Sequence, residues 1–544
     1  MSHRDIACFR IIRKLMAHIN KNQLVQKKDD LEMAPNEQRD IAASSYTLCA
    51  DLDENFKQFL AVFNKCGDIQ YRQFELNTAQ QGAFIFISGL GDINAVDMDL
   101  LKYAIESSLT GKSEGLSEDK KAAIQSKLSF TSQTSWSDDF RASVEGILSG
   151  KLAVLLDGFT QVLLLNVKGL ETRSIEEPAT EAIIRGPRDG FQESISTNIS
   201  LIRRRLKTTQ LKLEMFTAGK LSGTDIAITY LEGIAKESLV KEVKERVGRI
   251  QIDAILESGY VEELIEDNSV SPFPQVMVTE RPDKVVGNLL EGKVAIIIDN
   301  TPFVIVVPGT FFQLLQTPED YYQRYFVASA IRILRFIAVV SSLLLPSLYI
   351  ALTTYHHEMI PTMLLISIAS SRETVPFPAF VEALLMEVAF EGLREAGVRL
   401  PRPVGQAVSI VGALVIGQAA VAAGIVSSPL LIIVSMTGIA SFLFPSFQLG
   451  LAFRLLRFPM MVAAATFGLY GILMLLLLLL LHLLHLQSFG VPYMTPLSPL
   501  RAGELKDVIF RANWVKMTKS PKSGGVSKNT NNLFSSVRRR QPKK

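Results

Sequence analysis

The pattern of hydrophobic and polar positions changes along the chain. Between residues 45 and 310, short apolar runs alternate with stretches whose apolar positions recur at helical spacing, which indicates strands and helices that cover one another. From residue 326 the apolar runs lengthen, and no Asp, Glu, Lys or Arg occurs in 404–453 or in 458–500. A bilayer crossing needs about 20 apolar residues. The pattern predicts an α/β soluble region followed by an all-α polytopic membrane domain.

The soluble region contains an internal repeat. Segment 147–169, ILSGKLAVLLDGFTQVLLLNVKG, is similar to segment 289–309, LLEGKVAIIIDNTPFVIVVPG. Each segment has two apolar runs around an Asp turn, which predicts a β-hairpin. The helix and strand patterns upstream of each segment keep nearly the same offset. We therefore expect two tandem α/β subdomains, at 45–170 and 171–310.

The membrane domain is expected at 326–487, with four or five spans. The expected spans are 336–357 with a kink at Pro346, 404–427, 429–453, which ends at Arg454 and Arg457, and 458–486. Segment 359–371 is too short to cross and is interpreted as a re-entrant or interfacial element. Four spans place the C-terminal tail on the side of the soluble region, whereas five reverse this. We prefer four spans with one re-entrant segment.

The net charge of +3 hides an uneven distribution. Residues 501–544 carry 12 Lys or Arg against 2 acids. We expect a basic N-terminal arm at 1–44 and a basic cytoplasmic tail at 488–544 that touches anionic membrane lipid. The N-terminus has no apolar run long enough for a signal peptide, so the soluble domain is expected on the cytoplasmic side. No motif supports nucleic-acid binding.

No catalytic chemistry is visible in the sequence. Its three cysteines lack metal-ligand spacing, and neither a Walker motif nor a nucleophile with a matching base is present. We predict that the chain is not an enzyme and that it has no metal site and no cofactor.

The stretch RGPRDGFQESI at 185–195 resembles a phosphate-binding loop ahead of a helix. Such loops need backbone N–H groups that face the anion, and usually a Lys-Ser/Thr pair. Pro187 removes one N–H, and no such pair follows. The preferred interpretation is a structured turn. Its arginines would pair with nearby acids or contact a partner, which leaves Arg185, Arg188 and Asp189 as candidates for inter-subdomain or subunit contact.

The span 404–427 is rich in small residues and free of charge. Small residues allow close helix packing, and the same property would suit a pore wall. Hydrophobic constrictions gate channels by dewetting, and uncharged polar groups can contact a passing ion. The pore-lining candidates are Gln406, Ser409, Val411, Gly412, Val415, Ile416 and Gln418.

Three carboxylates, Glu387, Glu391 and Glu395, recur at a spacing of four residues and share one helical face. One interpretation is an amphipathic helix at the membrane surface. The other is an acidic vestibule at a pore mouth, which concentrates cations once several copies, for example five, form a ring.

Long blocks of the sequence resemble a known family. They include RGPRDGFQE, ILESGYVEELIED, TERPD, EGKVAIIIDNTPFVIVVP, YHHEMIPTMLLISIA and GVPYMTPLSP. These blocks are similar to the A-subunit family of spore germination receptors, the GerA family, from about residue 45 to about residue 515. The resemblance implies an A subunit in the spore inner membrane that works with a transporter-like B subunit and a lipoprotein C subunit.

The resemblance also implies nutrient-triggered ion release through a channel made of several A subunits, with a pentamer as one candidate assembly. A paralogue that accompanies dipicolinate release is similar over the same blocks and is the alternative function.

Overall fold

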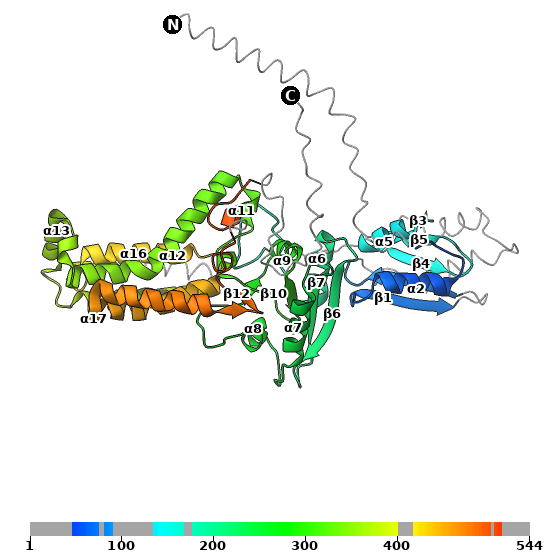
Figure 1. Cartoon of the computed structure of the whole chain (residues 1–544), viewed down its shortest axis with the longest axis horizontal. Coiled ribbons are helices and arrows are strands. Elements are labelled where there is room, and N and C mark those ends of the chain that lie inside the picture. Colours follow the sequence, from blue (N-terminus) through cyan, green and yellow to red (C-terminus); the bar gives the residue numbers. More distant parts are fainter. Residues whose placement is uncertain are drawn as a thin grey trace, which may run out of the picture.

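The computed structural model describes residues 46–75, 81–90, 134–167, 177–400, 417–501 and 505–513. Two α/β units follow one another and are followed by a bundle of long helices (Figure 1). The α/β region followed by a helical region confirms the predicted fold class.

The first α/β unit contains a five-stranded antiparallel sheet. Its strand order is β1-β2-β4-β5-β3. The strands are β1 (Ile69–Glu75), β2 (Gln81–Ile87), β3 (Thr134–Ser137), β4 (Leu152–Leu156) and β5 (Val162–Leu165). Helices α2 (Leu52–Val62) and α5 (Phe140–Leu148) cover one face, where the rings of Phe59 and Phe140 lie 4.5 Å apart between centroids.

The second unit has helices on both faces of its sheet. The strand order is β6-β7-β9-β10-β8. The strands are β6 (Leu211–Ala218), β7 (Thr224–Leu231), β8 (Met277–Thr279), β9 (Val294–Ile298) and β10 (Val304–Val307). Helices α6 (Ile195–Arg205) and α9 (Pro282–Leu290) cover one face, and α7 (Glu237–Gly248) and α8 (Ser258–Ile265) cover the other. Successive side chains of a strand point to opposite faces, so Ala227 packs toward α6 while Ile226 and Ile228 pack toward α7.

The two units share their topology and their local polar contacts. Asp157 accepts a hydrogen bond from the backbone N–H of Leu52 at the start of α2 (3.5 Å), and Asp299 accepts one from Ile195 at the start of α6 (3.0 Å). The Asn198 side chain bonds to both backbone groups of Gln192, and Asn55 makes the same pair of bonds in the first unit. The same strand order and the same contacts indicate that the two units are structural repeats of each other.

A short joint connects the two units. The backbone of residues 65–67 runs beside Leu213 of β6, with one hydrogen bond of 2.8 Å from the Leu213 N–H and one of 2.9 Å to its carbonyl. Next to this joint, the guanidinium of Arg203 donates to both carboxylate oxygens of Asp68, at 2.7 and 2.9 Å. Both side chains are buried. The bidentate geometry fixes the angle at which the units meet.

The C-terminal region is mainly helical. Its elements are α10 (Phe311–Leu314), α11 (Glu319–Tyr322), α12 (Tyr325–Thr354), η2 (His357–Met359), α13 (Thr362–Arg372), α14 (Ala379–Arg399), α16 (Ser428–Phe442), α17 (Phe447–His485), β11 (Gln487–Ser488), β12 (Val491–Pro492) and η3 (Leu505–Asp507). Within the described residues, α12 and α17 are long and apolar enough to cross a bilayer. The short segment predicted at 359–371 forms η2 and α13 at the far end of the bundle (Figure 1).

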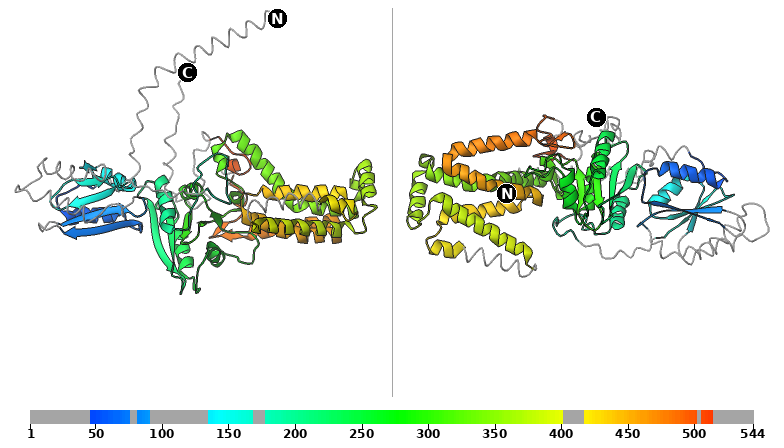
Figure 2. Two further views of the ribbon diagram at one scale, coloured as in Figure 1. Left: turned by 180° about the vertical axis from the view of Figure 1, so that it is seen from behind. Right: turned by 90° about the horizontal axis from the view of Figure 1, so that it is seen from below.

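Helix α17 is a hairpin of two helices. Gly468 has φ +60° and ψ −140°, a conformation that favours glycine, and the chain reverses there. At the start of α17 Gln448 bonds to Glu262, and near its end His482 bonds to Ser271, so both ends lie beside the second unit. The right-hand view of Figure 2 shows the two arms side by side.

The hairpin corrects the predicted ends of the last spans. We expected 429–453 to be one span, with Arg454 and Arg457 beyond its end. Instead α16 ends at Phe442, and both arginines lie inside the first arm of α17. Pro445 disfavours helical geometry at the residue before it, and Ser446 then caps the new helix through its hydroxyl.

The predicted tail at 488–544 also needs correction over its described part. Residues 487–492 form a small hairpin, and Ser488 and Tyr493 are fully buried. The Ser488 hydroxyl donates to the carbonyl of Gln275 at 2.5 Å. The prediction of a solvated tail rested on its basic residues. The apolar and hydroxyl side chains of 488–496, however, pack this segment against the second unit.

Candidate functional site

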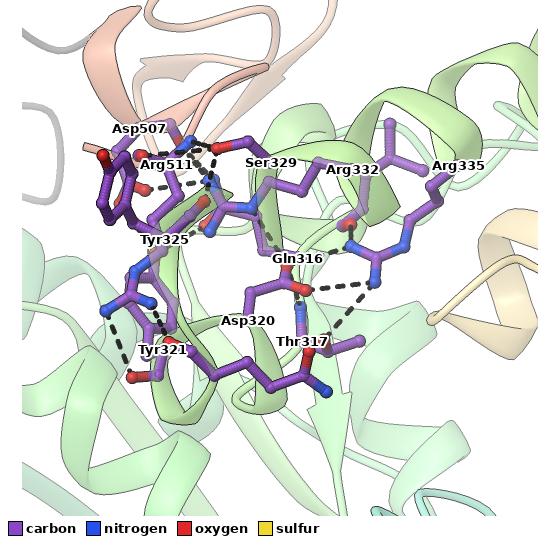
Figure 3. A network of polar contacts seen from close by, with 12 residues as sticks. Gln316, Thr317, Asp320, Tyr321, Tyr325, Ser329, Arg332, Arg335, Asp507 and Arg511 are labelled. Carbon is purple, nitrogen blue, oxygen red and sulfur yellow. Dashed lines mark hydrogen bonds and ion pairs between the residues drawn. The ribbon is translucent and has the colours of Figure 1, made fainter. Parts of the chain in front are cut away.

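The link between the second α/β unit and α12 is built around one carboxylate. Asp320 of α11 is only 3% exposed. Arg332 and Arg335 lie one turn apart on the same face of α12, and both reach Asp320 Oδ2 at 3.0 Å (Figure 3). Burial alone would raise the pKa of Asp320, but the hydrogen bonds and charges of Arg335 and Arg332 outweigh it and lower the pKa. Asp320 is therefore an ionised anchor for the first long helix.

The C-terminal segment completes this junction from the other side. Arg332 Nη1 donates to both the carbonyl and the side chain of Asp507, at 2.7 and 2.8 Å. The hydroxyl of Tyr321 donates to Asp507 Oδ2 at 2.7 Å, and the Arg332 guanidinium lies 5.3 Å from the centre of the Tyr321 ring. Arg511 donates to the carbonyl of Gln323 at 2.6 Å. The junction therefore joins α11 and α12, which are neighbours in sequence, to a segment 175 residues beyond Arg332.

The RGPRDGF loop reaches the same junction. Arg281 donates to the carbonyl of Pro187 at 2.9 Å, which fixes the loop to the start of α9. Gly186 has φ +148°, and a Cβ atom there would lie 2.8 Å from the ring of Tyr322 in α11. The hydroxyl of Tyr322 in turn donates to Asp283 at 2.6 Å. The loop is a structured turn that packs against the entrance to α12.

The three contact candidates of this loop have different environments. Asp189 pairs with Arg205 of α6 at 2.6 Å, and both are partly buried. Arg188 pairs with Glu177 at 2.9 Å on the surface, where such a pair contributes little. Arg185 is exposed, and no ion pair joins it to another described residue. Asp189 is therefore part of the fold, whereas Arg185 and Arg188 remain on the surface.

A buried ion pair lies inside the helical bundle. Glu387 of α14 is 0% exposed and pairs with Nη1 of Arg457 in α17. The Nε of Arg457 also donates to the carbonyl of Ser342 in α12, at 2.8 Å. One guanidinium thus connects α12, α14 and α17.

Glu391 extends the charged cluster by one turn of α14. Its carboxylate lies 3.3 Å from Arg394 and 2.9 Å from Arg454. Glu395 is exposed, one turn further along. The three carboxylates therefore do not form one open acidic face, because Glu387 and Glu391 are neutralised by arginines of the same chain. Helix α14 packs against α12, α16 and α17, so the interpretation as a membrane-surface helix does not fit it.

The pore-lining candidates mostly fall outside the described residues. This applies to Gln406, Ser409, Val411, Gly412, Val415 and Ile416. Gln418 is described, is exposed and lies in a short helical stretch at 417–422.

Asp320, Asp507 and Arg457 were not among the predicted functional residues, whereas Glu387, the partner of Arg457, was predicted as part of an acidic vestibule. One signal could have found the first set: Arg332 and Arg335 stand inside an otherwise apolar helix, and buried arginines require acidic partners. The sequence does not show which acid supplies the charge.

Protonation of Glu262 is expected to control stability near neutral pH. Burial raises the pKa of this α8 side chain to about 7, from 4.5, despite a hydrogen bond from Gln448 and with smaller raising effects from Glu266 and Glu257. Because the folded chain binds the Glu262 proton more tightly than the unfolded chain does, this group contributes its full share of folding stability below about pH 4.5. That share is lost as the pH rises through about 7. We expect the unfolding temperature of Glu262→Gln to fall less than that of the native chain between pH 5 and pH 8.

The control is Glu263→Gln, which removes an exposed neighbouring carboxylate and should leave the native pH dependence unchanged. Thermal unfolding of the purified full chain at several pH values measures the difference. Parallel curves for the native chain and Glu262→Gln would contradict the assignment.

Comparison with known proteins places this architecture in a family. The family described as "Bacillus/Clostridium GerA spore germination protein" matches residues 57–523. Spore germination protein KA of Bacillus subtilis is 48% identical over 448 residues, which cover 81% of this chain and 80% of the relative.

Two further similarities extend the comparison. The B. subtilis "uncharacterized membrane protein YfkQ" is 45% identical over 493 residues, which cover 90% of this chain and 93% of the relative. A crystal structure of the N-terminal domain of the A subunit of the Bacillus megaterium spore germinant receptor GerK3 matches with a TM-score of 0.39 and 33% identity. That match covers 49% of this chain and 98% of the GerK3 chain. With the family match spanning most of its length, the chain belongs to the Bacillus/Clostridium GerA family of spore germination proteins.

Proposed function

We propose that this chain is the A subunit of a germinant receptor in the spore inner membrane. In this proposal it acts with a transporter-like B subunit and a lipoprotein C subunit. Several copies form a nutrient-gated ion channel, and the soluble units lie on the cytoplasmic side. Family membership and the spore germination relatives support the receptor role.

The observation that carries the mechanism is the junction at Asp320. One buried carboxylate holds two arginines of α12, and the same carboxylate belongs to the short linker that leaves the second α/β unit. A movement of that unit cannot leave α12 in place without breaking charge-assisted bonds in a buried site. The junction is therefore suited to transmit a change in the soluble units to the bundle.

The path of the chain supports the proposed membrane topology. Both ends of α17 lie beside the second unit, and the segment 505–513 binds Arg332 near the start of α12. The soluble units and the C-terminal segment thus lie on one side, which requires an even number of crossings. The hairpin of α17 contributes two of these crossings, whereas the four-span prediction counted 458–486 as a single crossing.

The ion path is proposed to run along the segment 404–427, as the small and uncharged residues indicate. Glu387 and Glu391 are assigned a role in holding the bundle together, because arginines already neutralise them. This assignment separates the residues that support the channel from those that would line it.

The receptor role is tested by deleting the gene from its spore-forming host. We expect the spores to lose K⁺ release in response to at least one nutrient mixture, and the intact gene to restore it. Release by a non-nutrient trigger that bypasses the receptors is the control. Normal release with every nutrient mixture tested would contradict the receptor role.

A further inference from the structure

Helix α8 has an exposed stripe of large apolar side chains. Tyr260 and Leu264 lie one turn apart on α8 and are 48% and 50% exposed; Leu256, which precedes the helix, is 67% exposed, and Val270 lies beyond its end. The opposite side of α8 packs Val261 and Ile265 into the core. A contiguous exposed apolar patch on a soluble element marks an interaction surface.

The charge around this stripe is negative. Glu257 and Glu263 lie beside the apolar side chains and are exposed, whereas Asp267, just after the helix, pairs with Arg246 at 2.5 Å. Helices that bind anionic membrane surfaces instead carry Lys and Arg on their polar face. The surroundings of α8 thus favour a partner with basic residues around an apolar side chain.

Basic residues around an exposed apolar side chain occur on the opposite face of the same unit. Ile184, directly before the RGPRDGF loop, is 88% exposed; Arg185 and Arg188 are exposed beside it, and Arg188 also makes the surface pair with Glu177. The loop is fixed on the α6 and α9 side of the sheet, through Arg281 and Tyr322, whereas α8 lies on the other side. One chain therefore carries two surfaces of complementary charge and matching apolar character that cannot meet within the same unit.

Both surfaces lie close to the helical bundle. Glu262 of α8 bonds to Gln448 at the start of α17, at 2.8 Å. Gly186 of the loop packs against Tyr322, three residues before α12 begins. Two chains inserted side by side in one membrane could bring the loop of one next to α8 of the other.

We propose that the exposed face of α8 binds the loop at 184–188 of an adjacent copy of this chain. The contact uses two different surfaces, so it is heterologous, and it builds a closed ring where the rotation between neighbouring copies closes. Ile184 packs among Leu256, Tyr260 and Leu264, while Arg185 and Arg188 face the acids beside them. This inference rests on the homo-oligomer of the proposed function and assigns its interface.

Cysteine cross-linking of the full chain tests the interface. The background carries Cys8→Ser and Cys49→Ser, and Cys66 remains because it is buried. Ile184→Cys and Tyr260→Cys are introduced together, and membranes that contain the protein are oxidised. We expect a ladder of covalent oligomers from the double variant and none from either single variant.

Two matched experiments sharpen this result. Co-expression of the two single variants with different tags should give dimers that contain one chain of each kind, because the surfaces differ. Pairing Tyr260→Cys with Leu221→Cys, which places a thiol at another highly exposed position, should give no ladder. Self-linking of Tyr260→Cys alone would overturn the heterologous contact.

The native mass of the untreated protein distinguishes failure of this interface from failure of the homo-oligomer itself. Oligomers without a ladder would overturn this interface and leave the homo-oligomer standing. A monomer in every preparation would overturn both. Protection of Tyr260→Cys from a water-soluble maleimide in monomeric, lipid-reconstituted protein would assign the α8 face to the membrane surface instead.

Discussion

Replacing Arg457 with methionine is expected to cause the largest loss of stability of any single change in the helical bundle. The substitution leaves the Glu387 carboxylate buried without its partner and removes the bond to the carbonyl of Ser342. Breaking a buried ion pair in this way costs about 3–5 kcal/mol. Thermal unfolding of the full chain in detergent measures the loss.

The matched variants separate charge burial from loss of packing. The double variant Arg457→Met with Glu387→Gln removes both charges, so it should recover much of the lost stability. Arg454→Met should cost less than Arg457→Met, because Glu391 keeps its contact with Arg394. If the double variant is as unstable as Arg457→Met alone, the buried pair is not what stabilises the bundle.

The second large effect is expected from Asp320→Asn. The variant keeps the shape of the side chain but leaves the guanidiniums of Arg332 and Arg335 without the charge that they share. We expect a loss of about 3–5 kcal/mol at the junction, reduced to the extent that Asp507 continues to hold Arg332. In spores, nutrient-triggered K⁺ release should be lost or strongly slowed.

Glu319→Gln is the control for this experiment, because it neutralises the adjacent carboxylate, whose hydrogen bond among the described residues comes from Gln323, directly after α11. The amount of each variant in the spore membrane must be measured beside K⁺ release. A variant Asp320→Asn that matches Glu319→Gln in both stability and release would exclude Asp320 as the link to α12.

The sequence was sufficient to predict the duplicated α/β region. Each of the segments 147–169 and 289–309 contains two apolar strands joined by a turn. The two strands of a hairpin are close in sequence, so a short stretch of sequence is enough to predict them. The matching positions of Asp157 and Asp299 show that the repeat extends to helix starts as well as to the core.

The charged sites could not be predicted in the same way. Arg454 and Arg457 were expected to end a span because each charge was considered alone. Their partners, Glu391 and Glu387, lie 63 and 70 residues earlier, on another helix. Gly468 gave no clear signal either, since glycine is frequent in membrane helices that do not reverse. Such features depend on which helices become neighbours, which periodicity does not determine.

A continuous series of contacts links the soluble units to the helical bundle. The RGPRDGF loop and the C-terminal segment both contact α11, and α11 holds α12 through Asp320. Helix α12 in turn contacts Arg457, which joins α14 and α17. A shift of the soluble units can therefore reach the bundle through bonded groups alone.

The central claim is that this chain provides a nutrient-gated ion path. Its most direct test is K⁺ flux through liposomes that contain the purified chain with its B and C partners, with the native chain beside Gly412→Trp. Gly412 lies outside the described residues, and a tryptophan there would obstruct a pore wall made of small side chains. The account predicts nutrient-dependent flux from the native protein and arrested flux from the variant, with assembly unchanged. Equal flux from both would place the ion path elsewhere, and no flux from the complete native receptor would contradict the channel itself.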